Sequence, residues 1–479
     1  MVASANHRWL ALALLSVVQF MIVLDIAIVN VALPSIQVDL GFSQENLQWV
    51  ISAYALVFGG FLLLGGRTAD IVGRRKLFLV GLGVFSVASL LAALAWNEPS
   101  LIGARAFQGL GAAIIAPAAL SILMTTFTEG RERNIALGVW GAVGGFGAAA
   151  GVLMGGVFTD ALSWEWIFYV NIPVGLAAIA LAPVLLAESR DAAAASFDAP
   201  GGLLVTSGLV AAVFGITQAN EYGWTSLATI GIFAAAIALL VGFVVWELRA
   251  KDPLMSFSIF RIKTVAGANI AGFILGTALF SMFLMLTLYM QQVLGYSAMK
   301  TGIAYLAVAG TSIVWAMVAQ TLVTKVGVKP VLVSGMALLT VGLLSFTQVS
   351  VGGSYVGDLL PGFLLTAAGM AFSFVSISIA ALAGVEARDA GLASGLINTS
   401  QQIGGALGIA VLSAVAIAQT NGAARTGSDA APQALTDGFQ AAFWVGVGVA
   451  AVGVVAALFL IRKEELETVP VGEPVPAAA

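Results

Sequence analysis

The sequence predicts an all-α membrane protein whose helices cross the bilayer fourteen times. Of its 479 residues, 60% are hydrophobic and 9% are charged, whereas a soluble domain carries about 25% charged residues because its surface faces water. Fourteen apolar stretches have about the 20 residues that a helix needs to cross the hydrocarbon core. The 55 glycines agree with this interpretation, since small residues let spanning helices approach closely.

The first apolar stretch follows Arg8 and runs from Trp9 to about Leu33. A secretory signal has an apolar region of only about 7–15 residues, so we interpret this longer stretch as the first span. The remaining spans are expected at 46–69, 77–96, 101–125, 134–159, 166–187, 200–219, 226–246, 265–290, 300–324, 329–349, 355–380, 392–418 and 438–461.

The loop charges orient these spans. Basic residues gather in cytoplasmic loops. If the N-terminus is inside, only Lys300 and Arg425 of the 20 basic residues fall outside, while Arg105 lies within a span. One missed or additional helix would invert every later loop and destroy this asymmetry. The pattern predicts a multi-pass protein of the cytoplasmic (inner) cell membrane with both ends in the cytoplasm.

An internal repeat divides the chain. The segment Gly73–Gly81 recurs as Gly327–Gly335, 254 residues later, with matching glycines and one matching basic residue. Repeated halves are common in secondary transporters. The second copy follows span ten rather than span eight, which indicates two additional helices between pseudo-symmetric halves. We therefore expect a six-helix half at 1–190, two inserted helices at 191–250, a second six-helix half at 251–464 and a disordered cytoplasmic tail at 465–479.

The composition argues against several function classes. There is no cysteine, and His7 is the only histidine, so neither thiol chemistry nor a metal site is expected. A net charge of −4 gives no indication of a nucleic-acid partner. No paired intramembrane acids suggest an enzyme, and no separate cofactor is indicated.

Two ionisable residues lie inside predicted spans, where charge is costly and usually functional. Asp25 belongs to the first span and Arg105 to the fourth, and both fall in the outer half of the bilayer. Desolvation favours the protonated carboxyl group and a nearby arginine favours the charged one, so a change in their separation would change proton binding. A static ion pair that fixes helix packing is the alternative.

Three further patterns have a packing interpretation beside a functional one. Gly66, Asp70, Gly73, Arg74 and Arg75 form a tight cytoplasmic link between spans two and three, or else an ordinary basic loop. A glycine stripe in span five provides a packing surface or a moving interface, and its members are Gly147, Gly151, Gly155 and Gly156. Several side chains could line a substrate cavity or bond helix to helix, namely Gln19, Asn30, Gln108, Tyr289, Gln292, Trp315, Asn398 and Gln401.

At these motifs the chain resembles the major facilitator superfamily, in particular its fourteen-span drug:proton antiporter branch. The matching segments are Leu24–Pro34, Gly66–Lys76, Arg105–Ala113, Trp164–Pro173 and Asn398–Gly405. The resemblance itself extends over nearly the whole chain. The resemblance implies the major-facilitator fold and transport by alternating access, in which proton entry drives drug exit.

The resemblance also assigns roles. Asp25 and Arg105 match the proton-coupling positions, while Asp70 and Arg74 match those of a conformational latch. The expected partners are small hydrophobic or amphipathic substrates, protons and the lipid bilayer. The proton gradient supplies the energy, and the monomer is expected to function alone. Alternatives are a dedicated exporter of one metabolite or antibiotic, or an importer.

Two positions depart from the family pattern. Val152 stands where the antiporter motif of the fifth helix has proline, so an expected kink is lost and the direction of transport is less firmly implied. The predicted span at 300–324 contains no acidic residue, which disfavours substrates with two positive charges.

Overall fold

The computed structural model describes residues 5–127, 130–190, 198–251, 253–385, 390–425 and 431–466. Within these ranges, 14 helices are long and apolar enough to cross a membrane. This number and their order confirm the predicted all-α membrane architecture. The segment that opens the predicted inserted region (191–197) and most of the predicted tail (467–479) lie outside the described residues.

The first six spans are α1 (Ala5–Leu40), α2 (Trp49–Val72), α3 (Arg74–Ala93), α4 (Glu98–Thr126), α5 (Arg131–Ala161), and a crossing made of α6 (Trp166–Tyr169) and α7 (Asn171–Leu185). Two spans follow, α8 (Ala199–Tyr222) and α9 (Leu227–Glu247). The last six are α10 (Lys263–Leu288) with the π-helical turn η2 (Tyr289–Val293), α11 (Ala298–Val326), α12 (Val328–Phe346), α13 (Leu360–Ala380) preceded by η3 (Tyr355–Leu359), α14 (Ala390–Arg425) and α15 (Ala431–Leu460). The short helices η1 (Phe257–Arg261) and α16 (Lys463–Leu466) precede α10 and follow α15.

Two predicted boundaries differ from the structure. The first span was expected to end near Leu33, but α1 continues through Pro34 to Leu40. Hydropathy marks the apolar stretch, whereas backbone hydrogen bonding carries the helix on through more polar residues. At the other end of the chain, Glu465 lies in α16, and one of its carboxylate oxygens accepts a hydrogen bond from the backbone N–H of Thr264. The described part of the predicted tail is therefore helical.

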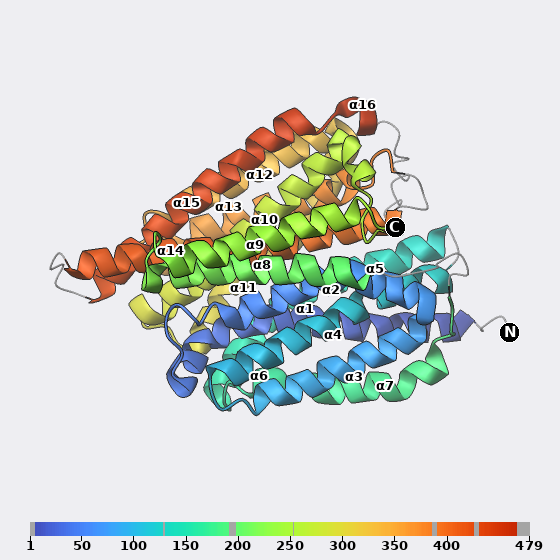
Figure 1. Cartoon of the computed structure of the whole chain (residues 1–479), viewed down its shortest axis with the longest axis horizontal. Helices are drawn as coiled ribbons and strands as arrows, with labels where there is room; N and C mark the ends of the chain where they lie inside the picture. Colours follow the sequence, from blue (N-terminus) through green and yellow to red (C-terminus); the bar gives the residue numbers. More distant parts are fainter. Residues whose placement is uncertain are drawn as a thin grey trace.

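The same helix pairs pack together in the first six and the last six spans. Helices α2 and α3 pack on α4 as α11 and α12 pack on α13; α1 packs on α5 as α10 packs on α14; and α3 packs on α7 as α12 packs on α15. Figure 1 shows the first six spans in the lower part of the bundle and most of the last six in the upper part. The chain thus forms two pseudo-symmetric groups of helices.

The turns that carry the sequence repeat occupy equivalent places in these groups. Gly73 alone separates α2 from α3, and Gly327 alone separates α11 from α12. Their φ angles are +128° and +90°, a region that residues with a Cβ rarely enter. Eight residues on, a Cβ at Gly81 would lie 2.8 Å from Ile115 of α4, and one at Gly335 would lie 2.8 Å from Phe372 of α13. The repeat therefore marks a tight turn followed by a close helix contact.

The two groups meet along α2 with α14 and along α5 with α11. We call the end of the bundle where α1 begins and α15 ends the terminal end. Away from it, a Cβ at Gly156 of α5 would lie 2.7 Å from the Met299 Cα of α11, and the Met299 N–H donates to Asp160 at 2.9 Å. Toward the terminal end the same two helices are largely exposed. Among the described side chains of residues 131–146 in α5, only Ala136 is buried. Among those of residues 309–326 in α11, only Ala319 and Val323 are buried.

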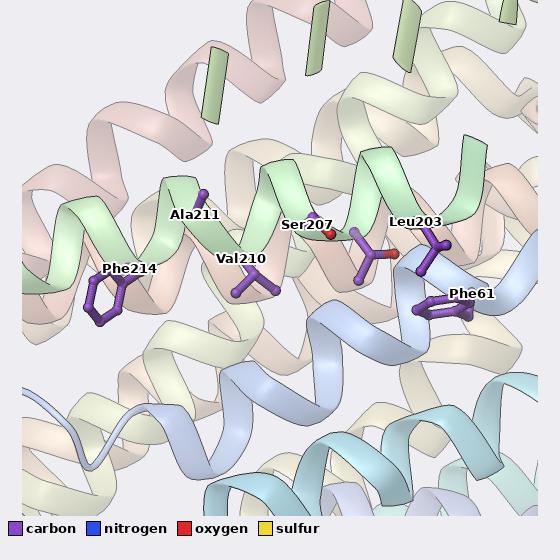
Figure 2. A pocket seen from close by; sticks show the side chains of 7 residues that line it. Phe61, Leu203, Ser207, Val210, Ala211 and Phe214 are labelled. Atoms are coloured by element: carbon purple, nitrogen blue, oxygen red, sulfur yellow. The ribbon is translucent and has the colours of Figure 1, made fainter. Parts of the chain in front are cut away.

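Helices α8 and α9 lie outside this two-fold arrangement and run together across the bundle (Figure 1). Helix α8 packs against α9, α2 and α14, so it covers one of the two seams between the groups. A pocket of about 350 Å³ lies where α8 meets α2. Figure 2 shows the α8 side chains facing it together with Phe61 of α2. Its lining contains none of the site residues that the sequence predicts.

Candidate functional site

Asp25 is buried near the middle of α1 and forms an ion pair with Arg105 of α4. The Arg105 Nη1 atom lies 2.8 Å from Asp25 Oδ2, and the two residues are 1% and 0% exposed. The two side chains are therefore in direct contact. Because α1 extends to Leu40, Asp25 also lies farther from the helix end than the predicted span indicated.

Two amide side chains complete the shell around the carboxylate. Gln108, one turn along α4 from Arg105, donates from Nε2 to Asp25 Oδ1 at 2.7 Å. Asn171, the first residue of α7, donates from Nδ2 to the same oxygen at 2.8 Å. Both amides are buried. Asp25 therefore accepts three side-chain hydrogen bonds from two other helices.

Arg105 is held by groups other than its counter-ion. Its Nε atom donates to the Val50 carbonyl oxygen of α2 at 2.9 Å, and its Nη1 atom donates to Gln108 Oε1 at 2.5 Å. The guanidinium carbon lies 4.5 Å from the ring centre of Tyr54, within the range of a cation–π contact. The guanidinium therefore has partners on α2 and α4 besides the carboxylate on α1.

Two polar atoms beside the pair, the Tyr54 hydroxyl and Asn171 Oδ1, have no hydrogen-bond partner among the described residues. Buried polar atoms are usually paired, so an unpaired one indicates a bound water or a second arrangement.

Sequence reasoning missed three members of this network. Asn171 stands in one of the quoted motifs but is 146 residues from Asp25, so nothing in the sequence placed it there. Tyr54 stacks on Arg105, and the Ser89 hydroxyl accepts from Gln108 at 2.9 Å. Because their neighbours come from other helices, only the packing of α2, α3 and α7 identifies them.

The predicted latch residues tie α2 and α3 to the segment after α7. Asp70 accepts from Arg74 at 2.9 Å. Glu188, which follows α7, accepts from the backbone N–H groups of Arg75 and Lys76 at 3.1 and 3.2 Å. These N–H groups begin α3 and have no intrahelical acceptor, so the carboxylate caps the helix.

The two glycines of the predicted latch lie at close contacts. A Cβ at Gly73 would lie 2.8 Å from Glu188 Oε1. A Cβ at Gly66 would lie 3.3 Å from the Pro117 Cβ of α4.

The glycine stripe of α5 lies against α1 on both sides of Asp25. Cβ atoms at Gly147, Gly151 and Gly155 would lie 3.3 Å from the Phe20 carbonyl oxygen, 2.9 Å from that of Leu24 and 2.6 Å from that of Ile28. Gly156 instead faces α11 in the other group of helices. The stripe thus brings bare backbone against the helix that carries the carboxylate.

The eight predicted cavity side chains are distributed over separate places. Gln108 belongs to the Asp25 network, while Asn398 and Gln401 line a pocket of about 100 Å³ between α13 and α14. Gln19 is half-buried, and Asn30 donates to a carbonyl oxygen of its own helix. Tyr289 donates to the Ser350 carbonyl oxygen, and Gln292 donates to Gln37. Trp315 packs edge-on to Phe372.

The sequence is similar to a known family and to several known proteins. The family profile described as Major Facilitator Superfamily matches residues 15–409. The puromycin resistance protein pur8 of Streptomyces alboniger is 38% identical over 95% of this chain and 92% of its own length. The cephamycin export protein CmcT of Amycolatopsis lactamdurans is 39% identical over 86% of each chain.

A solved structure shares the fold. The crystal structure of a bacterial homologue of the human lysosomal transporter Spinster, in an inward-facing and unoccupied conformation, matches with a TM-score of 0.67. It covers 96% of this chain and 98% of that one at 15% sequence identity, so the similarity concerns the fold alone.

Proposed function

Since the chain belongs to the major facilitator superfamily and is therefore a membrane transporter rather than an enzyme, we propose that it exports small hydrophobic or amphipathic molecules in exchange for protons. The similar proteins named for puromycin resistance and cephamycin export support the outward direction, although Val152 replaces the motif proline. The proposed topology places both ends in the cytoplasm, with a six-helix half on each side of the α8–α9 pair.

The buried Asp25–Arg105 pair is the observation that carries proton coupling. A buried charge is retained only with partners, and Asp25 has three donors from two other helices. A carboxylate that loses an arginine partner binds a proton more readily. When α1 moves relative to α4, the proton therefore replaces the guanidinium, and Arg105 keeps Val50, Gln108 and Tyr54 as partners.

Alternating access is supported by the uneven contact between α5 and α11. The two helices pack closely away from the terminal end, and the rest of each is largely exposed. With the terminal end in the cytoplasm, this arrangement is inward-facing. Proton uptake at Asp25 would then accompany separation of Gly156 from Met299 and closure at the cytoplasmic end, where the α2–α3 turn acts as the latch.

Transport in inverted membrane vesicles with an acidic interior tests the proposal. Wild-type protein should accumulate puromycin or a lipophilic dye, and Asp25→Asn should fall to the level of vesicles without the transporter. Asp39→Asn is the matched control, because Asp39 lies on the same helix but is exposed. Equal gradient-driven uptake by wild type and Asp25→Asn, at equal amounts of protein in the membrane, would exclude Asp25 as the coupling site.

A dedicated exporter of one antibiotic is the second candidate. The two relatives named above carry the names of puromycin and of cephamycin, which favours a narrow substrate range. Competition separates the candidates: a multidrug exporter shows mutual inhibition among unrelated hydrophobic compounds, whereas a dedicated one is inhibited only by close analogues.

A further inference from the structure

A second pair of buried acids lies where α8 begins and α9 ends. Asp198 directly precedes α8 and Glu247 is the last residue of α9, and they are 6% and 4% exposed. Gly201 leaves space for both carboxyl groups, because a Cβ there would lie 2.5 Å from Glu247 Oε1 and in contact with Asp198 Oδ2.

One oxygen of each carboxyl group already accepts hydrogen bonds from the protein. Asp198 Oδ1 accepts from the backbone N–H of Gly201 at 2.9 Å and from the Trp246 indole N–H at 2.7 Å. Glu247 Oε2 accepts from the backbone N–H of Met255 at 3.1 Å. The pair therefore joins the start of α8 and the end of α9 to the linker that leads toward α10.

The other oxygen of each carboxyl group has no hydrogen-bond donor among the described residues. These oxygens are Asp198 Oδ2 and Glu247 Oε1, which are both buried and lie beside the same glycine. Two adjacent carboxylates repel each other, and such a pair can hold one proton between its members. The ion pairs among the described residues include neither Asp198 nor Glu247.

The charged groups near the pair lie on the linker after α9 and on α2. On the linker, Arg249 and Lys251 are exposed. On α2, Leu64 contacts Gly202, and the exposed Arg67 lies almost one helical turn farther along. Among the described residues, Asp198 is the charged group beside Glu247.

We propose that Asp198 and Glu247 bind one shared proton and that this proton fastens the α8–α9 hairpin to the linker before α10. The carboxylic acid O–H of one residue donates to the carboxylate of the other, which leaves the pair with a single negative charge. Loss of the proton leaves two adjacent carboxylates, whose repulsion separates the ends of the two helices. This site is distinct from Asp25 and does not depend on the proposed transport cycle.

Amide variants test the shared proton directly. In Asp198→Asn the amide oxygen can keep the bonds from Gly201 and Trp246 while its NH₂ group donates to Glu247. Glu247→Gln offers the same replacement from the other side. Infrared difference spectra of the purified protein at neutral pH should show one protonated carboxyl group fewer in each variant than in wild type. The control Glu221→Gln, at the exposed far end of α8, should lose none. Retention of the full carboxylic acid signal by both variants would overturn the proposal.

Distances between spin labels test the fastening. The chain has no cysteine, so the exposed Leu203 and Leu248 can be replaced by labelled cysteines without background. The wild-type distance should lengthen or broaden at the pH where the infrared band disappears, while Glu247→Gln stays unchanged. If the wild-type distance stays unchanged when the infrared band disappears, the shared proton does not hold the two helix ends together. Restoration of the short distance by Na⁺ or K⁺ at constant high pH would show a cation rather than a proton in the site.

Discussion

Gly156 provides the sharpest test of how the two groups of helices close against each other. A Cβ at this position would lie 2.7 Å from both the Met299 Cα and the Ala298 carbonyl oxygen of α11. Ordinary contacts are longer than about 3.4 Å, so Gly156→Ala forces α5 and α11 apart by several tenths of an ångström. Overpacking of this kind costs about 1–3 kcal/mol.

The overpacking destabilises the conformation in which α5 and α11 touch at Gly156. A cost of about 1–3 kcal/mol changes the equilibrium between two conformations by roughly 5- to 150-fold. Gly156→Ala should therefore populate the form in which α5 and α11 separate away from the terminal end. Labelled cysteines at the exposed Leu162, directly after α5, and at the exposed Ile303 of α11 report this separation as a longer spin-label distance.

The matched control is Gly145→Ala on the same helix, where a Cβ meets nothing within 4 Å. Both substitutions gain the same helix propensity, about 1 kcal/mol for alanine over glycine, so their difference isolates the contact with α11. Equal distance distributions for the two variants would refute the reasoning. Substrate uptake measured on the same samples links the shift to transport.

Three further outcomes are expected. Asn171→Ala removes one of the three donors to Asp25 and should destabilise the protein by about 1–3 kcal/mol and reduce proton-driven uptake; thermal unfolding in detergent that matches wild type would show the bond to be dispensable. Glu188→Gln weakens the cap on α3 and should lower stability by about 0.5–2 kcal/mol, whereas the exposed Glu221→Gln should not; equal unfolding temperatures would contradict this. Burial raises the pKa of Glu465, but hydrogen bonds from Thr264 and Lys263 and the nearby Arg462 outweigh it and place the pKa below its ordinary value of 4.5. The anchor that Glu465 forms on α10 is therefore present above that value and is lost as pH falls through the lowered pKa. Hydrogen exchange at Thr264 should rise on acidification in wild type and be high at every pH in Glu465→Ala, which has no acceptor for the Thr264 N–H.

The closeness of Asp25 and Arg105 shows where sequence reasoning on the site succeeds. Charges inside apolar spans are conspicuous, and the span order placed both in the same part of the bilayer. It could not show that the contact is direct, nor that Asn171 and Gln108 share one carboxylate oxygen. Those contacts depend on helix rotation and crossing, which hydropathy does not encode. For the same reason the predicted cavity residues are scattered, since polarity alone does not indicate which face of a helix a side chain occupies.

Sequence by itself determined the number of crossings and the repeat around Gly73 and Gly327, because both depend on local properties: the length of apolar segments and a backbone turn that favours glycine. Tertiary structure alone decided that the α5 stripe packs on the helix carrying Asp25, that Gly156 faces the other half, and that Asp198 meets Glu247 across the α8–α9 hairpin. These are contacts between residues distant in the chain, and they follow from packing small residues and buried charges together in three dimensions.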